Sequence, residues 1–318
     1  MKAGDKGGFS ALTWSTNVMP LIQSGLVPIP VDCDRNTLNV MADQLYERIQ
    51  ETNMKAFFIT NALGLAGDLD VIRKICHEAE IILLEDNCEA LGTELQSGRT
   101  GNFGQMTSFS FFVAHHMSTI EGGMVCTNEI EFAEMLRIVR ANGWDRNLSA
   151  DQQHRWRKKY NVMSEFYAKY IFYDLGFNFR PTEITGFLGR NQLKLLNENI
   201  KIREKNYIDL ETVAKENPDL FTLKRDHITV LSSFAFPVVC RTHELRDFYM
   251  RQFAGAGVEI RPMIAGNIQE QPFFRKYVSQ KYDLPGTEFI HECGFYCGNY
   301  PELTTNDLEI LKSCLSKY

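Results

Sequence analysis

Short signatures that would assign a nucleotide or metal site are missing from this chain of 318 residues. No GxGxxG motif follows an apolar strand-like run and no Walker motif occurs, so the nucleotide-binding folds that depend on them receive no support. No HExxH motif or comparable ligand spacing is present, and we expect no metal site. The eight cysteines include no CxxC or CxC pair, which argues against a zinc ribbon and a thioredoxin-type motif.

Long apolar runs and a basic excess are also missing. No apolar stretch approaches the roughly 18 residues of a bilayer-spanning helix, and the first residues contain no apolar core of a signal peptide. We therefore expect a cytoplasmic protein with reduced thiols and no membrane partner. The 34 Lys and Arg against 40 Asp and Glu give a net charge of −6, which disfavours a nucleic-acid partner. The one dense basic run, 155–159, predicts a solvated loop or, alternatively, a patch facing substrate phosphates.

Apolar strand-like runs alternate with helical spacing through the first half of the chain. The runs lie at 27–31, 56–60, 81–84, 108–112 and 124–127, and helical patterns at 38–49, 69–79 and 129–142. Continuous apolar strands between helices predict an α/β fold with a mixed, mostly parallel sheet and helices on both faces. Ligands of such sheets lie at the carboxyl ends of the strands, and Asp86 is at such an end.

The second half predicts a smaller unit. Helical spacing over 182–215 indicates a long connecting helix, followed by a strand (229–239), a helix (244–254), a strand (257–261) and a closing helix (305–316). We predict a large α/β domain, 1–199, and a smaller C-terminal α/β domain, 200–318. The chain starts abruptly, because the apolar stretch 11–14 follows Gly7 and Gly8 with no preceding helix to cover it.

Three local patterns carry candidate chemistry: LEDNCEALG at 84–92, SFSFFVAHHMSTIEGG at 108–123 and GVEIRPMIAGN at 257–267. Each also has a structural explanation. Acidic residues after a strand often cap a helix, a His-His pair is often hydrogen-bonded structure, and Gly122-Gly123 suits a turn. From the residues alone, the chain is a two-domain α/β enzyme with a site near Asp86 and His115.

Together these patterns resemble the DegT/DnrJ/EryC1/StrS sugar aminotransferase family over nearly the whole chain. The resemblance implies fold type I of the pyridoxal phosphate (PLP) enzymes and a homodimer with shared active sites. It also implies cofactor contacts: Trp14 stacks on the ring, Asp86 pairs with the pyridine nitrogen, Cys88 lies on the opposite ring face, Glu89 lies near the ring hydroxyl, Ser110 touches the phosphate, and Asn178 reaches the phosphate of the neighbouring subunit. A carboxylate at the nitrogen keeps the ring cationic, so that it acts as an electron sink.

His115 departs from the aminotransferase pattern. That position holds the lysine that binds PLP covalently in aminotransferases, and no lysine occurs here between Lys74 and Lys158. The context Ala-His-His is similar to the nucleotide-sugar 3-dehydratase branch of the family. This similarity implies non-covalent PLP or pyridoxamine phosphate (PMP) and removal of the 3-hydroxyl of a nucleotide-linked 4-keto-6-deoxyhexose, for deoxysugar and O-antigen biosynthesis. Histidine has an ordinary pKa near 6.5, and we predict that His115 is the catalytic base.

Cysteine positions separate two groups within that branch. One group carries an iron–sulfur cluster on four cysteines, two of them one residue apart. This chain has no such pair and no cysteine between Cys126 and Cys240, so the resemblance favours the cluster-free group, which acts on a GDP-linked sugar and regenerates PMP from glutamate. The implied substrate contacts are Arg261, whose fork suits the glutamate carboxylate or a phosphate, Asn267 and Arg146. A surface salt bridge is the alternative for Arg261.

Two other hypotheses stay open. Family members carry a helix and a small-residue loop before the segment that residues 2–5 match, so we expect this chain to lack the first helical piece of the cofactor domain. Gly7 and Gly8 also weaken the expected first strand. A catalytically impaired relative that binds the cofactor or a partner subunit is therefore the alternative. An ordinary aminotransferase is disfavoured by the missing lysine.

Overall fold

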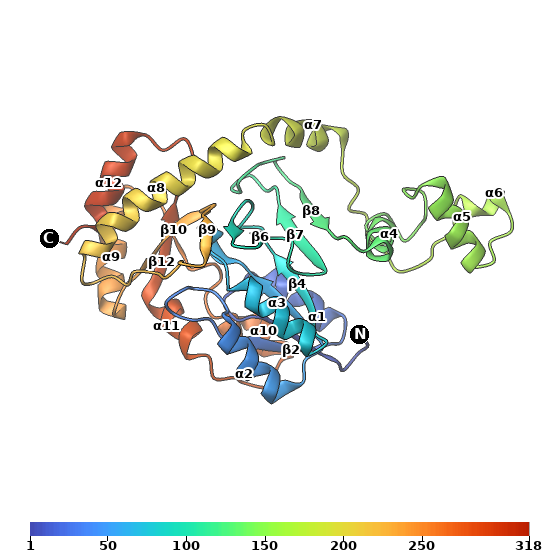
Figure 1. The fold of residues 1–318 in the computed structure, drawn as a ribbon, viewed down its shortest axis with the longest axis horizontal. Coiled ribbons are helices and arrows are strands. Elements are labelled where there is room, and N and C mark those ends of the chain that lie inside the picture. The colour runs from blue at the N-terminus through green and yellow to red at the C-terminus, as the bar shows by residue number, and fades with distance from the viewer. Residues whose placement is uncertain (318) are drawn as a thin grey trace.

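A six-stranded sheet is the largest element of the computed structural model, which describes residues 1–317 (Figure 1). In spatial order its strands are β2 (Val27–Val31), β1 (Lys6–Ser10), β3 (Ala56–Thr60), β4 (Ile82–Asp86), β7 (Met106–Ser110) and β8 (Gly123–Cys126). Every neighbouring pair is parallel except β7 and β8, which are antiparallel. The prediction of a mostly parallel sheet is confirmed, and the parallel strands bring their carboxyl ends to one edge.

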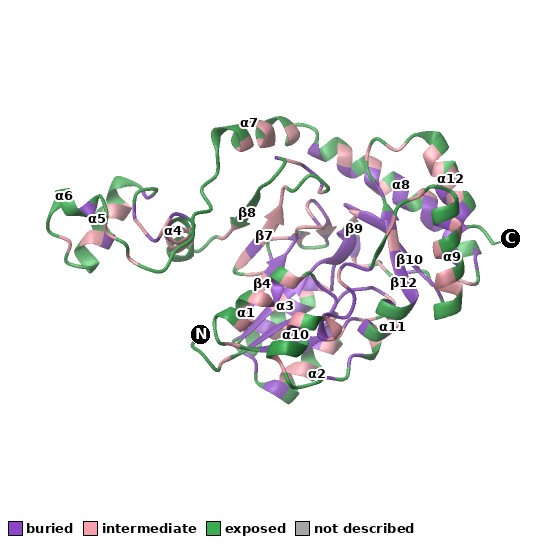
Figure 2. Ribbon diagram, turned by 180° about the vertical axis from the view of Figure 1, so that it is seen from behind, coloured by how far each residue is buried: buried purple, intermediate pink, exposed green. Residues whose placement is uncertain are grey.

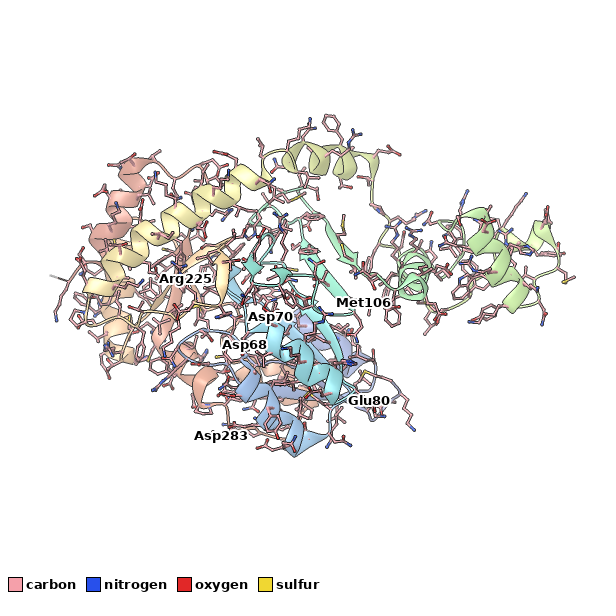
Figure 3. The ribbon with its side chains drawn as sticks, viewed as in Figure 1. Asp68, Asp70, Glu80, Met106, Arg225 and Asp283 are labelled. Atoms are coloured by element: carbon pink, nitrogen blue, oxygen red, sulfur yellow. The ribbon has the colours of Figure 1, made fainter. Side chains whose placement is uncertain are left out.

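Helices α2 (Ala42–Thr52) and α3 (Leu69–Glu78) pack against this sheet. Their apolar side chains Leu45 and Ile72 join Phe57 and Ile59 of β3 in a buried core, and each such side chain contributes about 1.5–3 kcal/mol on burial. The carboxylate of Asp68, labelled in Figure 3, accepts a hydrogen bond of 2.8 Å from the first backbone N–H of α2 and so ties the starts of both helices together.

Strand β1 forms despite its two glycines, because close packing requires them. A Cβ atom on Gly8 would lie 2.5 Å from the sulfur of Met54, and one on Gly7 would lie 3.0 Å from a methyl group of Leu21. The strand pairs along its length with β2 on one side and with β3 on the other. Its position inside the sheet therefore outweighs the low strand propensity of glycine.

A second sheet lies in the C-terminal half. Its order is β10 (Ala235–Val239), β12 (Gly294–Gly298) and β11 (Ile260–Pro262), all antiparallel. The helices around it are α8 (Leu196–Glu216), α9 (His243–Gly255), α11 (Pro285–Cys293) and α12 (Thr305–Leu315), and α10 (Pro272–Tyr277) precedes α11. The sequence patterns described above do not predict α10, α11 or β12. The predicted domain boundary near residue 200 falls inside α8 and stays a prediction.

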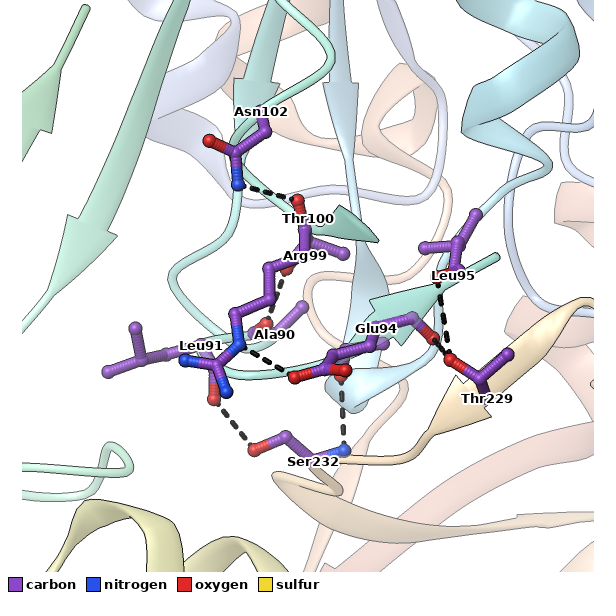
Figure 4. Close-up of polar contacts among 10 residues, drawn as sticks. Ala90, Leu91, Glu94, Leu95, Arg99, Thr100, Asn102, Thr229 and Ser232 are labelled. Atoms are coloured by element: carbon purple, nitrogen blue, oxygen red, sulfur yellow. Dashed lines mark hydrogen bonds and ion pairs between the residues drawn. The ribbon is translucent and has the colours of Figure 1, made fainter. Parts of the chain in front are cut away.

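The predicted strand 229–239 is wrong in its middle. It consists of β9 (Ile228–Val230) and β10, separated by residues 231–234, of which 231–233 are buried. Strand β9 joins β5 (Glu94–Leu95) and β6 (Gly98–Arg99) in a small third sheet, and Figure 4 shows Ser232 bonded to the Leu91 carbonyl beside it. The break follows from close contact, since a Cβ atom on Gly64 would lie 2.2 Å from the Ser232 carbonyl oxygen. The predicted helix 182–215 likewise divides into α7 (Glu183–Gln192) and α8.

Residues 130–181, which include helices α4 (Ile130–Val139), α5 (Ala150–Lys159) and α6 (Glu165–Ala168), form an arm that projects from the sheet, and Figure 2 shows its largely exposed surface. The basic run 155–159 lies on α5, so the predicted loop is wrong. Glu134 binds Arg155 and the Trp156 indole there, and Asp145 binds Arg157. Within residues 1–317, no helix is long and apolar enough to cross a membrane.

Candidate active site

Asp86 ends strand β4 at the carboxyl edge of the sheet and is buried. One oxygen, Oδ2, accepts a hydrogen bond of 2.6 Å from Nδ2 of Asn17. The other, Oδ1, accepts bonds from the Cys88 backbone N–H (3.0 Å) and the Ser108 hydroxyl (3.2 Å). No lysine or arginine of the described chain forms an ion pair with it. A buried carboxylate without a cation is suited to a cationic ligand group.

Asn17 is a functional residue of this site that no sequence pattern predicts. Its side-chain amide also lies 2.9 Å from the hydroxyl oxygens of Thr13 and Thr60, which lie 2.6 Å from each other. Asn17 belongs to the 3₁₀ turn Ser15–Asn17, which begins directly after Trp14. The Trp14 side chain is 57% exposed, so its ring is available as a stacking surface. A polar residue one turn after Trp14 is too common in sequences to indicate this role.

Cys88 and Glu89 follow β4 and lie beside Asp86. Burial raises the pKa of the Cys88 thiol, and the Asp86 charge raises it further, so Cys88 is a neutral contact surface and not a nucleophile. Burial also raises the pKa of Glu89 to about 7, with a smaller contribution from Asp86. The Leu63 backbone N–H donates a hydrogen bond of 2.8 Å to Oε2 of Glu89, which holds the carboxyl group in place.

Ser110 and His115 belong to the segment that leaves β7. Ser110 is the last residue of the strand, and its hydroxyl accepts a hydrogen bond of 3.3 Å from the Phe112 backbone N–H. The half-buried His115 ring packs against Phe234, with a centroid separation of 5.2 Å. Its Nδ1 atom is inaccessible and has no hydrogen-bond partner. Burial lowers the pKa of His115, while the Asp86 charge opposes that effect, so the imidazole is neutral at pH 7.

His116 is buried more deeply than His115. Its Nε2 atom lies 2.9 Å from the Ser232 carbonyl oxygen, and burial lowers its pKa to about 3. A neutral imidazole that donates to a carbonyl is a structural link between the β7 segment and residues 231–234. Of the two histidines, His115 is therefore the one with titratable chemistry.

A cavity of about 810 Å³ opens beside His115. It is lined by residues of the segment 113–118, the start of α8, strands β11 and β12, and α12. Its lining includes Arg203, Arg261 and Tyr296 but no lysine, while Trp14 and Asp86 lie outside the lining. Arg261 is mostly exposed and pairs with Glu259, so it can turn toward a ligand or stay in its surface salt bridge.

Three predicted residues do not lie beside Asp86 or His115. Asn178 and Arg146 belong to the arm; Asn178 is exposed and accepts a bond from Arg180, and Arg146 lies over the Trp144 ring. Asn267 is buried next to Leu12, and its side-chain oxygen caps the 3₁₀ turn Ile268–Glu270. Their predicted contacts with ligands stay predictions. Among residues 1–317 no cluster of three or more His, Cys, Asp or Glu side chains could hold a metal ion.

Arg203 is a second residue that the sequence analysis missed. It lies on the buried face of α8 in line with Leu196, Ile200, Tyr207 and Leu210. The sequence contains a pattern that indicates this residue, because an arginine at a position of apolar helical spacing is unusual unless its charge has a use. The structure places it on the wall of the cavity with both histidines.

Comparison with protein families gives a match over residues 2–315 to the DegT/DnrJ/EryC1/StrS aminotransferase family. Among curated proteins, GDP-4-keto-6-deoxy-D-mannose 3-dehydratase of Escherichia coli O55:H7 is 33% identical over 319 residues, which cover 99% of this chain and 81% of that protein. The protein of the same description from Yersinia pseudotuberculosis is 32% identical over 320 residues and covers 99% and 80%.

Solved structures agree with these matches. A GDP-4-keto-6-deoxymannose-3-dehydratase with a trapped PLP-glutamate geminal diamine superposes with a TM-score of 0.88 at 32% identity, over 99% of this chain and 81% of that one. The Escherichia coli enzyme with bound hydrated PLP gives the same TM-score, identity and coverage. The sugar aminotransferase CalS13 from Micromonospora echinospora, at 20% identity and a TM-score of 0.83 over 98% and 80%, shares the fold.

Proposed function

The chain belongs to the DegT/DnrJ/EryC1/StrS aminotransferase family, and from that membership we propose that it is a PLP-dependent nucleotide-sugar 3-dehydratase. Its substrate is GDP-4-keto-6-deoxy-D-mannose, the sugar named in relatives at 32–33% identity, and its product serves deoxysugar and lipopolysaccharide biosynthesis. The observation that carries the proposal is His115, which faces a cavity with no lysine in its lining. Without a lysine, the cofactor is held non-covalently and ordinary amino transfer is disfavoured.

The residues at the sheet edge fit a PLP-type cofactor. Asp86 is a buried carboxylate that lacks a cationic partner within residues 1–317, which suits a protonated pyridine nitrogen. Trp14 and Cys88 would contact the two ring faces, Glu89 the ring hydroxyl and Ser110 the phosphate. When bound, the cofactor supplies a cationic ring that accepts electrons as the bond to the 3-hydroxyl breaks.

The protein's own part in the reaction is proton transfer and positioning. His115 accepts a proton at Nε2, because Nδ1 is inaccessible, and can return it to the departing hydroxyl group. Its pKa is lowered by burial, so the ring is ready to accept a proton at neutral pH. Asp86 would keep the nitrogen of a bound cofactor ring protonated, since its two oxygens are fixed by Asn17, Ser108 and the Cys88 backbone. Arg261 is the proposed contact for the glutamate carboxylate or a substrate phosphate.

The test is the complete reaction with its co-substrate. Purified protein is incubated with PLP, glutamate and GDP-4-keto-6-deoxy-D-mannose, and the sugar is followed by mass spectrometry. We expect loss of one oxygen atom from the sugar, with 2-oxoglutarate and ammonia formed in equal amounts. The His115→Asn variant is the control and should form no product. An amino sugar would identify an aminotransferase instead, and failure to bind PLP would support the impaired relative. The CDP- and dTDP-linked sugars in parallel reactions test the choice of nucleotide.

We also propose a homodimer in which Asn178 reaches the neighbouring active site. The support is a set of highly exposed apolar side chains on the arm and α7: Met163 at 92%, Leu175 at 90%, Phe166 at 71% and Phe187 at 68%. Large apolar side chains that are this exposed are typical of interaction sites. Light scattering should give twice the chain mass; a monomer at working concentrations would contradict the proposal.

The proposed location is the cytoplasm, where glutamate is available, and cell fractionation checks it.

A further inference from the structure

Arg203 is a buried cation with no carboxylate partner in the described chain. Its side chain is 4% exposed, and no Asp or Glu forms an ion pair with it. Its Nη1 atom donates hydrogen bonds to the carbonyl oxygens of Ser233 (3.2 Å), Phe234 (3.1 Å) and Asn299, while Nε has no partner. An unpaired buried charge costs free energy that carbonyl contacts only partly offset. A methionine of similar volume would avoid this cost, so the charge indicates a use.

Residues 232–234, which Arg203 holds, also support the histidines. The Ser232 carbonyl accepts from His116, and the Phe234 backbone N–H donates to the Leu63 carbonyl over 3.0 Å. The Phe234 ring lies 5.2 Å from the His115 ring and 6.2 Å from the His116 ring. A direct path of contacts therefore runs from the Arg203 guanidinium through the Phe234 backbone and ring to the His115 imidazole.

We propose that Arg203 is a positioning residue for the His115 base, because it fixes the Phe234 ring against the imidazole and places an unpaired positive charge beside it. The inference rests on the proposed function, in which His115 accepts a proton. A nearby positive charge disfavours protonation of the imidazole, so Arg203 keeps His115 in the form that a base needs.

Other charged groups around His115 act in both directions. Asp86, from β4, favours the protonated imidazole and opposes Arg203. His116 is neutral because its pKa is about 3. The remaining charged groups on the cavity wall are Glu259 and Arg261 of the β11 segment, Glu302, and Asp307 of α12. The Glu302 charge acts on Arg203 and partly offsets it, but the two side chains form no ion pair in the described chain. Glu259 and Arg261 neutralise each other in their exposed ion pair. Of the two arginines on the cavity wall, Arg203 is therefore the one that is buried and forms no ion pair in the described chain.

The experiment measures protonation of His115 directly. The PLP-loaded protein with ¹³C-labelled histidine is titrated by NMR, and the His115 signal is identified by its absence in His115→Asn. Arg203→Met should raise the His115 midpoint by about half a pH unit or more. Arg203→Lys, which keeps the charge, should leave the midpoint near that of the unmodified protein. Arg225→Met is the matched control, because Arg225 pairs with Glu211 away from this cavity, and should also leave it unchanged.

Turnover supplies the second readout. Arg203→Met should lower kcat about tenfold or more, a loss of about 1.4 kcal/mol of transition-state stabilisation, with KM changed little. Arg203→Lys should recover part of kcat. Arg203→Gln replaces Arg203→Met if the latter does not fold, because glutamine removes the charge and keeps a donor for the carbonyls. An unchanged His115 midpoint in the charge-removing variant overturns the inference, and so does an equal shift in Arg203→Lys.

Failure of the proposed function would look different. If the unmodified protein dehydrates none of the sugars, the base role of His115 is lost as a premise. The titration still reports whether Arg203 controls the His115 proton, because the midpoint does not depend on turnover. A shifted midpoint without dehydration would therefore refute the 3-dehydratase and not the contact between Arg203, Phe234 and His115.

Discussion

The amide Nδ2 of Asn17 lies 2.6 Å from Oδ2 of Asp86, and this hydrogen bond joins the segment after β1 to the end of β4. The same amide lies 2.9 Å from the Thr13 and Thr60 hydroxyl oxygens, so the segments at the ends of β1 and β3 together orient the carboxylate at the end of β4. Asn17 therefore fixes the direction in which Asp86 presents its charge at the edge of the sheet.

Asn17→Ala should weaken cofactor binding. The substitution leaves Oδ2 of Asp86 without its charge-assisted donor, a loss of about 1.5–3 kcal/mol, so we expect the PLP affinity to fall about tenfold or more. Absorbance titration with PLP measures this. Asn61→Ala is the matched control, because the Asn61 side-chain amide donates to Asn87 and not to the Asp86 carboxylate. Equal PLP affinity in Asn17→Ala and the unmodified protein would count against this role.

The pH profile of the dehydration reports the state of His115. Burial lowers its pKa below the ordinary value of about 6.5, so kcat should stay level through that pH and fall only at lower pH. Stopped assays across pH 5–8 measure the acid limb. If kcat instead falls at a pH above the ordinary histidine pKa of about 6.5, a different group titrates. His115→Asn is the control and should have no activity at any pH.

Glu89→Gln should change how stability depends on pH in the cofactor-free protein. The folded protein holds the Glu89 proton up to a pKa of about 7, whereas the unfolded chain loses it near the ordinary value of about 4.5. Between these values the folded state binds more protons, so stability falls as pH rises through this window and is lowest above it. Glutamine keeps the acceptor for the Leu63 N–H without the charge.

We therefore expect the free energy of unfolding of Glu89→Gln at pH 8 to exceed that of the unmodified protein by up to about 3 kcal/mol. Near pH 4.5 the two free energies of unfolding should be equal. Urea unfolding at both pH values measures the difference. The control is Glu47→Gln, for which we expect no difference at either pH, because Glu47 is exposed on α2. An offset of the same size at both pH values would exclude a titration of Glu89.

Phe187→Glu should separate the proposed dimer. The Phe187 side chain is 68% exposed in the single chain, so a charge there costs the monomer little. Buried in an interface, the same charge would cost several kcal/mol and shift the mass in light scattering from two chains to one. Phe248→Glu on α9, at 41% exposure, is the control and should leave the mass unchanged.

Residues with local signals were found from the sequence, and residues defined by long-range contacts were not. Asp86 follows a continuous apolar strand, and the parallel sheet places it at the expected edge. Asn17 acts through a carboxylate 69 positions away, which no local pattern reveals. The continuous apolar composition of 229–239 predicts an unbroken strand, but the close passage of Gly64 forces residues 231–234 out of the ladder. Glycines 7 and 8 predicted a weak strand, yet the sheet on both sides decides the outcome.

Phe234 is at once part of the cavity wall and the packing partner of His115. A smaller residue there would admit a bulkier sugar and, at the same moment, release the imidazole from its support. Substrate range and turnover therefore cannot be optimised independently at this position. Laboratory evolution toward larger sugars should pass through slow intermediates at Phe234, and recovery of rate should require compensating changes in the segment that carries the histidine.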